Sequence, residues 1–386
     1  MPASEWLAEP IADIRLLDHH CHAPQRLRQE IMARHLRQPF TESTAPEVVD
    51  LDVPQAIAYR AMLRWLARLL GTDPTEPAVL AARARYEAPS YHRLLADDAR
   101  IAACFDDYLY DEERCYSPAE WADLIGRPVR PIVRIETVAE RLLPDARSWD
   151  DLRHRFGHEL ATAAARGAVG LKSIAAYRSG LQIERVDAAS ADRAFLETIA
   201  EIDAGSFRRL EHKTLIDALL WEAVEVAAEL GLPLQLHVGL GDDDVFLPSS
   251  DPTFLRPLFQ EERYRHVPLV LLHCYPYVRQ AAYLASIYPN AYVDLGLTLP
   301  LAAGDAASIV REALGLAPTT KILASTDGHS LPEFQWFAAR LWRASLIQVL
   351  GALVDEALLA QTEALEIAAR ILHANAERIY PVERSA

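Results

Sequence analysis

The chain has 386 residues, 51% of them hydrophobic, and a formal net charge of -16 at pH 7. This length suits one large barrel domain or two ordinary domains, each with a sizeable core. The acidic balance argues against nonspecific binding to nucleic acid or to an anionic membrane, because both need a basic surface. We therefore expect a small molecule as the partner, and the sequence leaves a homo-oligomer open.

The cysteines and the N-terminal segment bear on the cellular compartment. The four cysteines show no CxxC spacing, which argues against a disulfide framework and favours a reducing compartment. The N-terminal segment carries Glu5, Glu9 and Asp13 and has no basic stretch followed by an apolar core. No apolar run approaches the roughly 18 residues of a membrane span. These features predict a soluble, cytoplasmic protein.

Short apolar runs rich in Val, Ile and Leu recur along the chain, separated by segments of helical period. This alternation is typical of βα units around a parallel sheet. We count eight runs: 15–22, 101–107, 131–136, 169–175, 233–238, 268–274, 291–297 and 321–327. The pattern predicts an α/β fold, a (β/α)8 TIM barrel that forms a single domain over residues 1–386.

The first run ends in Asp18-His19-His20-Cys21-His22. Side chains of a strand alternate between its two faces, so His20 and His22 point the same way and can bind one metal ion together. In a regular strand Asp18 shares that face. His19 has the opposite parity, and we expect it to be peripheral.

Almost eighty residues separate the first run from the second, which predicts a helical insertion over residues 23–100. The insertion contains helical patterns at 53–70 and 78–97, with a Pro-punctuated turn at 72–77 between them. It leaves the carboxyl end of the first strand, beside the candidate metal ligands. Two hypotheses follow: the insertion covers the pocket as a lid, or it packs against the flank of the barrel.

Lys172 lies in the fourth run, where the alternation places it opposite Leu171 and Ser173. A bare ammonium inside a barrel is strongly disfavoured by desolvation. Lys172 is therefore neutral, paired with a carboxylate such as Asp18 or Asp327, or chemically modified. Carbamylation by carbon dioxide would turn it into an anionic oxygen ligand that can bridge two cations.

Polar residues also end three later runs: His237, His273 and Asp327. The carboxyl ends of the strands are where parallel barrels carry their chemistry, so one metal-dependent active site is the economical explanation. Asp327 followed by Gly328 could be only a turn signal, but its position on the eighth run favours a ligand. His329 lies beyond that run, and we expect it to be peripheral.

Two stretches bear on what the site binds. Tyr177 and Arg178 directly follow the fourth run, and the planar fork of an arginine suits a carboxylate. Arg178 either binds a substrate carboxylate or forms a structural salt bridge. The acidic stretch at 242–244 either recognises an ammonium or is a solvated face.

These residues together resemble the amidohydrolase superfamily, in particular the amidohydrolase-related (amidohydrolase 2) branch that includes the N-terminal domain of nodulin and glutamine-synthetase fusion proteins. The resemblance covers essentially the whole chain. Its carriers are the segment 18–22, the string Gly-Leu-Lys-Ser-Ile-Ala-Ala-Tyr-Arg-Ser-Gly-Leu at 170–181, His237, His273, and Ser-Thr-Asp at 325–327.

The resemblance implies a role for each candidate residue. The implied metal ligands are His20, His22, Lys172 as a carbamate, His237, His273 and Asp327. Asp327, Lys172 and His273 would be the catalytic residues, and Tyr177 and Arg178 would bind substrate. The cofactor would be a divalent metal, foremost Zn²⁺, with one or two ions per chain, because other branches bind a single metal and use a histidine to polarise the substrate.

The implied activity is a metal-dependent hydrolase that cleaves an amide-like C–N bond with a metal-activated water. A γ-glutamyl or N-acyl amino-acid amide suits an arginine and an acidic loop at one rim. The alternative enzyme is a nonoxidative metal-dependent decarboxylase of a small carboxylic acid. A nonenzymatic scaffold is the third reading, since one fold serves many functions.

Overall fold

The computed structural model describes residues 2–26 and 31–381. The chain divides into two compact units. Unit 1 comprises Met1–Arg130 and Asp294–Ala376, and unit 2 comprises Pro131–Val293 and Glu377–Ala386. The prediction of a single domain over 1–386 stays a prediction.

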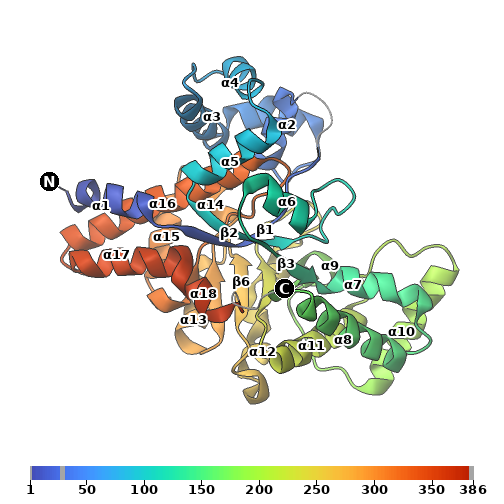
Figure 1. Ribbon diagram of the computed structural model, residues 1–386. Coiled ribbons are helices and arrows are strands. Elements are labelled where there is room, and N and C mark those ends of the chain that lie inside the picture. The colour runs from blue at the N-terminus through green and yellow to red at the C-terminus, as the bar shows by residue number, and fades with distance from the viewer. Residues whose placement is uncertain (1, 27–30, 382–386) are drawn as a thin grey trace. The chain divides into compact units, whose positions relative to one another are not determined.

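Eight strands alternate with helices and follow one another in one sheet in chain order (Figure 1). Their bounds are β1 Leu16–Cys21, β2 Ile101–Asp107, β3 Val129–Arg134, β4 Gly170–Ser173, β5 Leu234–Val238, β6 Leu269–His273, β7 Ala291–Asp294 and β8 Ile322–Leu323. The pairs β1–β2, β3–β4, β4–β5, β5–β6 and β6–β7 are parallel. Each of the eight predicted runs contains all or most of one strand, which confirms the predicted fold class.

Most helices of unit 1 precede or follow β1, β2 and β8 in the sequence. They are α1 Ala3–Asp13, α2 Ala33–Arg37, α3 Ile57–Leu70, α4 Glu76–Arg83, α5 Ala88–Asp98, α6 Pro118–Ile125, α14 Thr298–Leu301, α15 Ala306–Leu314, α16 Pro332–Asp355 and α17 Gln361–Ala369. The segment between β1 and β2 contains α2 to α5 and short 3-10 and π turns. Its proposed role as a lid stays a prediction.

The helices of unit 2 follow β3 to β6. They are α7 Ile135–Leu142, α8 Trp149–Ala165, α9 Ala175–Arg178, α10 Ala188–Asp203, α11 Lys213–Leu230, α12 Arg256–Gln260 and α13 Val278–Ile287. The short helix α18 Asn375–Ile379 crosses the boundary between the units.

Local sequence signals explain several helix ends. Helix α11 stops at Gly231, which adopts a left-handed φ of 64° that a residue without a Cβ reaches at no steric cost. Helix α6 begins at a capping box in which Ser117 accepts from the backbone of Glu120, and it ends at Gly126 in the left-handed region. The helix predicted over 78–97 divides into α4 and α5.

Helix α16 is long and apolar enough to cross a membrane by length and composition. In its most apolar window, 61% is buried inside the structure. Phe334, Trp342 and Leu346 of this helix are fully buried. This burial is typical of a core helix, and the soluble, cytoplasmic location stays a prediction.

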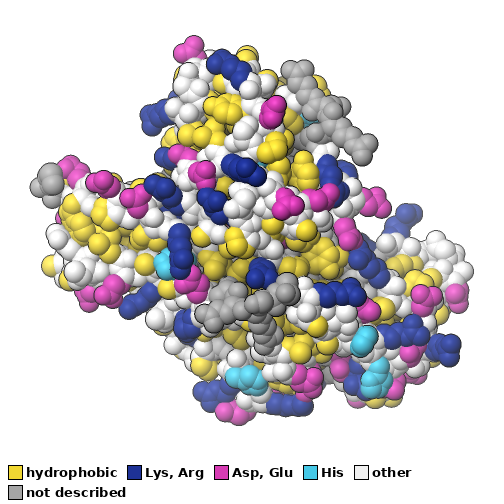
Figure 2. Space-filling view, in the orientation of Figure 1, with side chains coloured by type: hydrophobic (Ala, Val, Ile, Leu, Met, Phe, Trp, Pro, Cys, Tyr) yellow, Lys and Arg dark blue, Asp and Glu magenta, His cyan; other side chains and the backbone are white. Residues whose placement is uncertain are grey.

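The four cysteines are buried and form no disulfide, as their spacing predicts. On the face shown in Figure 2, basic and acidic side chains are interspersed. The absence of nucleic-acid and membrane partners stays a prediction, as does the oligomeric state.

Candidate metal centre and active site

A β-bulge in β1 determines which face of the strand each residue of the segment 18–22 occupies. Asp18 pairs with Cys104 and Cys21 with Asp106, so three steps along β1 match two along β2. Asp18 and Cys21 therefore share one face, where their ligand atoms lie within 4.8 Å of each other and of Cys104. The prediction that Asp18 shares the face of His20 and His22 is wrong, because the extra residue reverses the alternation.

The opposite face of β1 carries the candidate metal ligands of unit 1. The ligand atoms of His20, His22 and Asp107 lie within 4.8 Å of one another. Asp327 Oδ1 lies 3.0 Å from His20 Nε2 and 3.3 Å from His22 Nε2. Donors on a tetrahedral metal with bonds of 2.0 to 2.1 Å are about 3.3 Å apart. The spacing of these atoms is thus that of ligands on one ion.

The imidazole of His22 is oriented by a backbone carbonyl. His22 Nδ1 lies 3.2 Å from the carbonyl oxygen of Asp107. Because a carbonyl can only accept, Nδ1 carries the hydrogen in this contact, and the lone pair belongs to Nε2. Such a partner on the second ring nitrogen is the usual support of a metal-binding histidine. His22 Nε2 is the atom that approaches Asp327.

Asp327 lies four residues after β8, in a loop fixed to β1. The backbone N–H of Asp327 donates to the carbonyl of His20 over 3.0 Å, and that of His22 donates to the carbonyl of Gly328 over 2.6 Å. Asp327 has a φ of 48°, which is unfavourable for a residue with a Cβ. A Cβ at Gly328 would lie 2.5 Å from the Gln335 Cβ, so this position requires glycine. The fold imposes this conformation and aims the carboxylate at the two histidines.

Asp18 supports this loop from the other face of β1. Its carboxylate accepts hydrogen bonds from the backbone N–H and the hydroxyl of Thr326, at 2.8 and 2.5 Å, and from the Gln335 amide at 2.9 Å. Burial raises the pKa of Asp18 to about 6, although these hydrogen bonds oppose the shift. Asp18 is thus a positioning residue for the segment that carries Asp327.

His19 and His329 were both expected to be peripheral, and neither is exposed. His19 is buried and lies 3.3 Å from Asp294 Oδ1. Burial alone would raise the pKa of Asp294, but hydrogen bonds and the charge of His19 bring it below its usual value. His329 Nδ1 contacts the carbonyl of Asp327 at 2.9 Å, and burial lowers the pKa of His329. Both histidines support the loops around the candidate site.

In unit 2, Lys172 is 2% exposed and lies in β4 between Arg134 of β3 and Gln235 of β5. Its neighbour Ser173 donates its hydroxyl to Glu136 Oε1 over 2.6 Å. Ser173 therefore faces helix α7, and Lys172 points to the other face of the strand, as the alternation predicts. The carbamate on Lys172 stays a prediction.

His237 and His273 lie together in unit 2, with ring centroids 4.7 Å apart. His237 Nε2 lies 2.8 Å from the carbonyl oxygen of Leu240, so Nε2 carries the hydrogen and Nδ1 keeps the lone pair. His273 ends β6 with a φ of 67°, an unfavourable conformation of the kind that clusters at functional sites. The fold thus holds two imidazoles side by side at the carboxyl ends of neighbouring strands.

The loop after β5 fixes the partner of His237. Gly239 has a φ of 80°, and a Cβ there would lie 2.0 Å from the carbonyl oxygen of Tyr275. The next residue, Leu240, donates its N–H to that same oxygen over 2.7 Å. The missing side chain of Gly239 therefore lets the loop approach Tyr275 closely enough to place the Leu240 carbonyl on His237.

The predicted substrate residues Tyr177 and Arg178 follow β4. The Tyr177 ring packs on His237 with centroids 4.3 Å apart. The Arg178 Nη2 lies 3.7 Å from Glu140 Oε1, and its buried Nε has no hydrogen-bond partner within residues 2–26 and 31–381. Burial lowers the pKa of Arg178, and Glu140 only partly opposes this effect. Arg178 has a salt bridge, as one of its two hypotheses states, but a long one.

The acidic stretch 242–244 is engaged locally. Asp244 forms an ion pair with Arg209, and Asp242 Oδ1 accepts the backbone N–H of Asp244 over 3.2 Å. Burial raises the pKa of Asp242. These contacts favour the structural interpretation for Asp244.

Two carboxylates of the site were missed by sequence reasoning. Asp107 ends β2 and joins His20 and His22, and the rule that singled out His237 and Asp327 would have found it. Glu136, at the start of α7, accepts from Ser173 and from the backbone N–H of Ile174 over 3.0 Å. Glu136 ends the predicted run 131–136, so the same rule would have found it, although its partners are set by packing.

The donor set in unit 1 fits a divalent metal. Two imidazole nitrogens and two carboxylates converge at buried or nearly buried positions. Nitrogen and carboxylate oxygen are the ligand atoms that zinc and related ions accept. Grouped acids and histidines of this kind are electrostatically favourable when a cation lies among them.

The comparison with solved structures supports the same chemistry. A protein of Lactobacillus casei ATCC 334, described as a metal-dependent hydrolase, matches with a TM-score of 0.89 and 29% identity, covering 98% of each chain. The uronate isomerase of Thermotoga maritima matches with a TM-score of 0.67 and 14% identity, covering 98% of this chain and 97% of that one. At so low an identity, the isomerase shows the fold alone.

A curated relative and a family model extend the likeness to the sequence. Protein fluG of Emericella nidulans is 33% identical over 399 residues, which cover 95% of this chain and 45% of that protein. This chain thus spans about half the length of that relative. The amidohydrolase family model matches residues 143–382. With the (β/α)8 fold and a ligand group suited to a divalent metal, the chain belongs to the amidohydrolase family and is an enzyme.

Proposed function

We propose that this enzyme hydrolyses an amide-like C–N bond with the help of a divalent metal. The observation that carries the proposal is the convergence of Asp327 Oδ1 with His20 Nε2 and His22 Nε2 at 3.0 and 3.3 Å. A scaffold protein has no need to hold a carboxylate against two imidazoles at a strained φ of 48°.

Zn²⁺ is the proposed metal, with His20, His22 and Asp327 as ligands and Asp107 beside them. When bound, it would lower the pKa of a coordinated water and polarise the scissile carbonyl. His237, His273 and a carbamylated Lys172 remain the predicted ligands from unit 2. The lone pair on His237 Nδ1 supports that prediction.

Asp327 is the proposed general base and acid. Its carboxylate would take a proton from the attacking water as the new C–O bond forms at the carbonyl carbon. It would then give that proton to the leaving nitrogen as the C–N bond breaks, so the carboxylate ends unprotonated and no other proton acceptor is needed. The backbone contacts of Asp327 and Gly328 with His20 and His22 keep the carboxylate in place.

A γ-glutamyl or N-acyl amino-acid amide is the proposed substrate class. Arg178 supports this choice, because its buried Nε lacks a partner and its salt bridge to Glu140 is long. A substrate carboxylate could accept a hydrogen bond from this Nε and balance the guanidinium charge. Replacing Arg178 by Gln should raise KM for substrates with a free carboxylate about tenfold or more and leave uncharged amides unaffected.

Metal content per chain tests the centre. Protein purified without chelators should hold one or two equivalents by inductively coupled plasma mass spectrometry, and His20→Ala should hold less. If Lys172 bridges two ions as a carbamate, Lys172→Ala should lose about one equivalent. One equivalent unchanged in Lys172→Ala would remove the bridge, and none despite added metal would contradict the proposal.

Product analysis tests the reaction class. A panel of γ-glutamyl and N-acyl amino-acid amides should release an amine and a carboxylic acid, with uptake of one oxygen from labelled water. Release of carbon dioxide without that uptake would replace the hydrolase by the nonoxidative decarboxylase.

A further inference from the structure

Unit 1 contains a polar cavity of about 520 Å³, lined by residues of α1, α3, α5 and α16. Its polar lining consists of Arg68, Asp98, Arg340 and Arg343, and its aromatic wall is Trp65. We call these five residues the arginine pocket. None of them belongs to the candidate metal centre.

Arg343 is the unusual member of the arginine pocket. It is 6% exposed, and its Nη1 and Nη2 donate to the carbonyls of Ala339 and Ile14 over 2.9 and 2.8 Å. Its buried Nε has no hydrogen-bond partner, and no carboxylate pairs with its charge in the part of the chain that the structure describes. Buried guanidinium groups are normally matched by an anion, so this charge is incompletely compensated.

The neighbours of Arg343 add positive charge. Arg340 Nη1 contacts Asp98 Oδ2 at 2.6 Å, and the indole N–H of Trp336 donates to the same oxygen over 2.6 Å. Arg68 on α3 is exposed and has no ion pair within the described ranges. Three arginines and one carboxylate thus line this cavity, in a chain whose overall charge is -16. Burial lowers the pKa of Arg343 to about 10, and the positive charges of Arg340 and Arg100 contribute to this shift.

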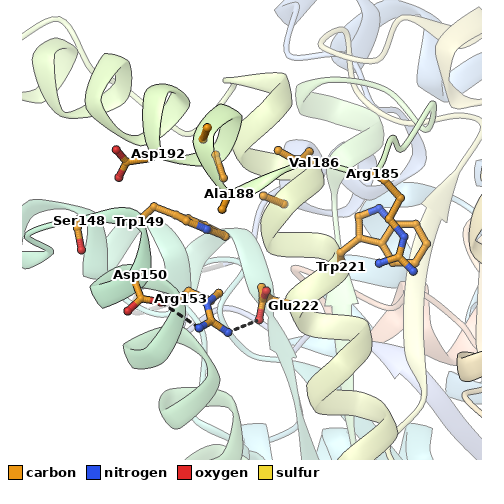
Figure 3. A pocket seen from close by; sticks show the side chains of 13 residues that line it. Ser148, Trp149, Asp150, Arg153, Arg185, Val186, Ala188, Asp192, Trp221 and Glu222 are labelled. Carbon is orange, nitrogen blue, oxygen red and sulfur yellow. Dashed lines mark hydrogen bonds and ion pairs between the residues drawn. The ribbon is translucent and has the colours of Figure 1, made fainter.

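A pocket in unit 2 shows the contrasting case (Figure 3). This cavity of about 640 Å³ is walled by Trp149 and Trp221. There Arg153 lies 2.9 Å from Asp150 and 3.6 Å from Glu222, and Arg185 stacks over the Trp221 ring at 3.5 Å. The arginines of that pocket are already engaged, whereas the arginine pocket keeps an excess of two positive charges.

We propose that the arginine pocket binds a phosphate dianion, free or as a phosphomonoester. The net charge of the arginine pocket, about +2, balances that of a dianion. Guanidinium groups bind phosphate oxygens through paired N–H donors. The guanidinium groups of Arg340 and Arg68 would donate to the phosphate oxygens, and the charge of Arg343, whose Nε is enclosed by protein atoms, would add to the attraction. Trp65 would lie against the group esterified to the phosphate.

Isothermal titration of the full-length metal-bound enzyme with inorganic phosphate and with phenyl phosphate tests the proposal. Both should bind saturably, and phenyl phosphate should bind more tightly because its ring can lie on Trp65. Arg68→Gln replaces an exposed residue of α3, and it should lower the affinity for both ligands about tenfold or more. Arg153→Gln, the matched change in the other pocket, should leave both affinities unchanged.

A second variant tests the role of the buried Arg343. Arg343→Gln removes this buried charge, and it should weaken the binding of both phosphates. A circular dichroism melt establishes that the variant is folded. If phosphate does not bind at millimolar concentration, or binds equally to wild type and Arg68→Gln, the proposal is wrong. Binding of benzoate without binding of either phosphate would also overturn it, in favour of a carboxylate.

Discussion

The two units hold their histidines in different ways. In unit 1, His20 and His22 point their Nε2 atoms at one carboxylate oxygen within 3.3 Å. In unit 2, His237 and His273 face each other as rings 4.7 Å apart, and His237 is held by a carbonyl oxygen. The first arrangement brings carboxylate and imidazole atoms together around one point, and the second places two imidazole rings side by side.

This difference indicates a division of roles. Acidic donors packed against imidazoles need a cation, so the ligands of unit 1 should determine whether metal is retained. Oriented imidazoles and a partly paired arginine instead suit substrate binding and polarisation, so unit 2 should affect turnover more than retention of that ion. The following predictions test this contrast.

The largest effect is expected from Asp327→Asn. Losing the carboxylate removes both a proposed metal ligand and the proposed proton carrier, so kcat should fall by about 10²- to 10⁴-fold and the metal content should decrease. Asp13→Asn, a change at an exposed carboxylate of the same unit, should alter neither. Full activity in Asp327→Asn would contradict the role given to unit 1.

A smaller effect is expected from Gly239→Ala in unit 2. The new Cβ would lie 2.0 Å from the Tyr275 carbonyl and displace the Leu240 oxygen from His237. Losing such support should lower kcat about 10- to 100-fold while the metal bound by unit 1 is retained. Gly205→Ala is the matched control, since Gly205 has a φ of 68° with nothing within 4 Å of the added Cβ. Equal losses in both variants would show that backbone strain alone explains the effect.

The next prediction concerns acid stability of unit 1. Burial lowers the pKa of His92 to about 4 from 6.5, so the unfolded chain binds its proton first and stability falls as the pH drops from 6.5 to 4. Between pH 7.5 and pH 5, wild type should lose about 2 kcal/mol more unfolding free energy than His92→Gln. Urea unfolding measures this difference. The exposed His158 of unit 2 gives the control, His158→Gln, which should behave as wild type.

The smallest effect is expected from Ser173→Ala. It removes the hydrogen bond to Glu136 Oε1 at 2.6 Å beside Lys172, which should lower the free energy of unfolding by about 1 kcal/mol. The metal bound by unit 1 should be unchanged. Ser206→Ala removes an exposed hydrogen bond to Glu201 and should cost less. A loss of metal in Ser173→Ala would link unit 2 to metal retention and weaken the contrast.

Sequence periodicity was sufficient for the strands and for many helix ends. The run 101–107 coincides with β2, and the helical pattern predicted over 53–70 contains α3. These elements are set by local alternation, helical period and terminating glycines, all of which lie in a few neighbouring residues. The predicted face of Asp18 is wrong, because the β-bulge that reverses the alternation depends on pairing with the partner strand β2.

The sequence by itself determined the order of strands, the family and the pairing of His20 with His22, because these depend on local pattern and spacing. Only the tertiary structure decided that Asp107 joins these histidines and that Asp18 turns away to hold Thr326. It also decided that Arg343 is buried with no carboxylate partner among residues 2–26 and 31–381. The physical reason is that side-chain contacts between distant segments follow from packing and backbone strain, which no short stretch of sequence encodes.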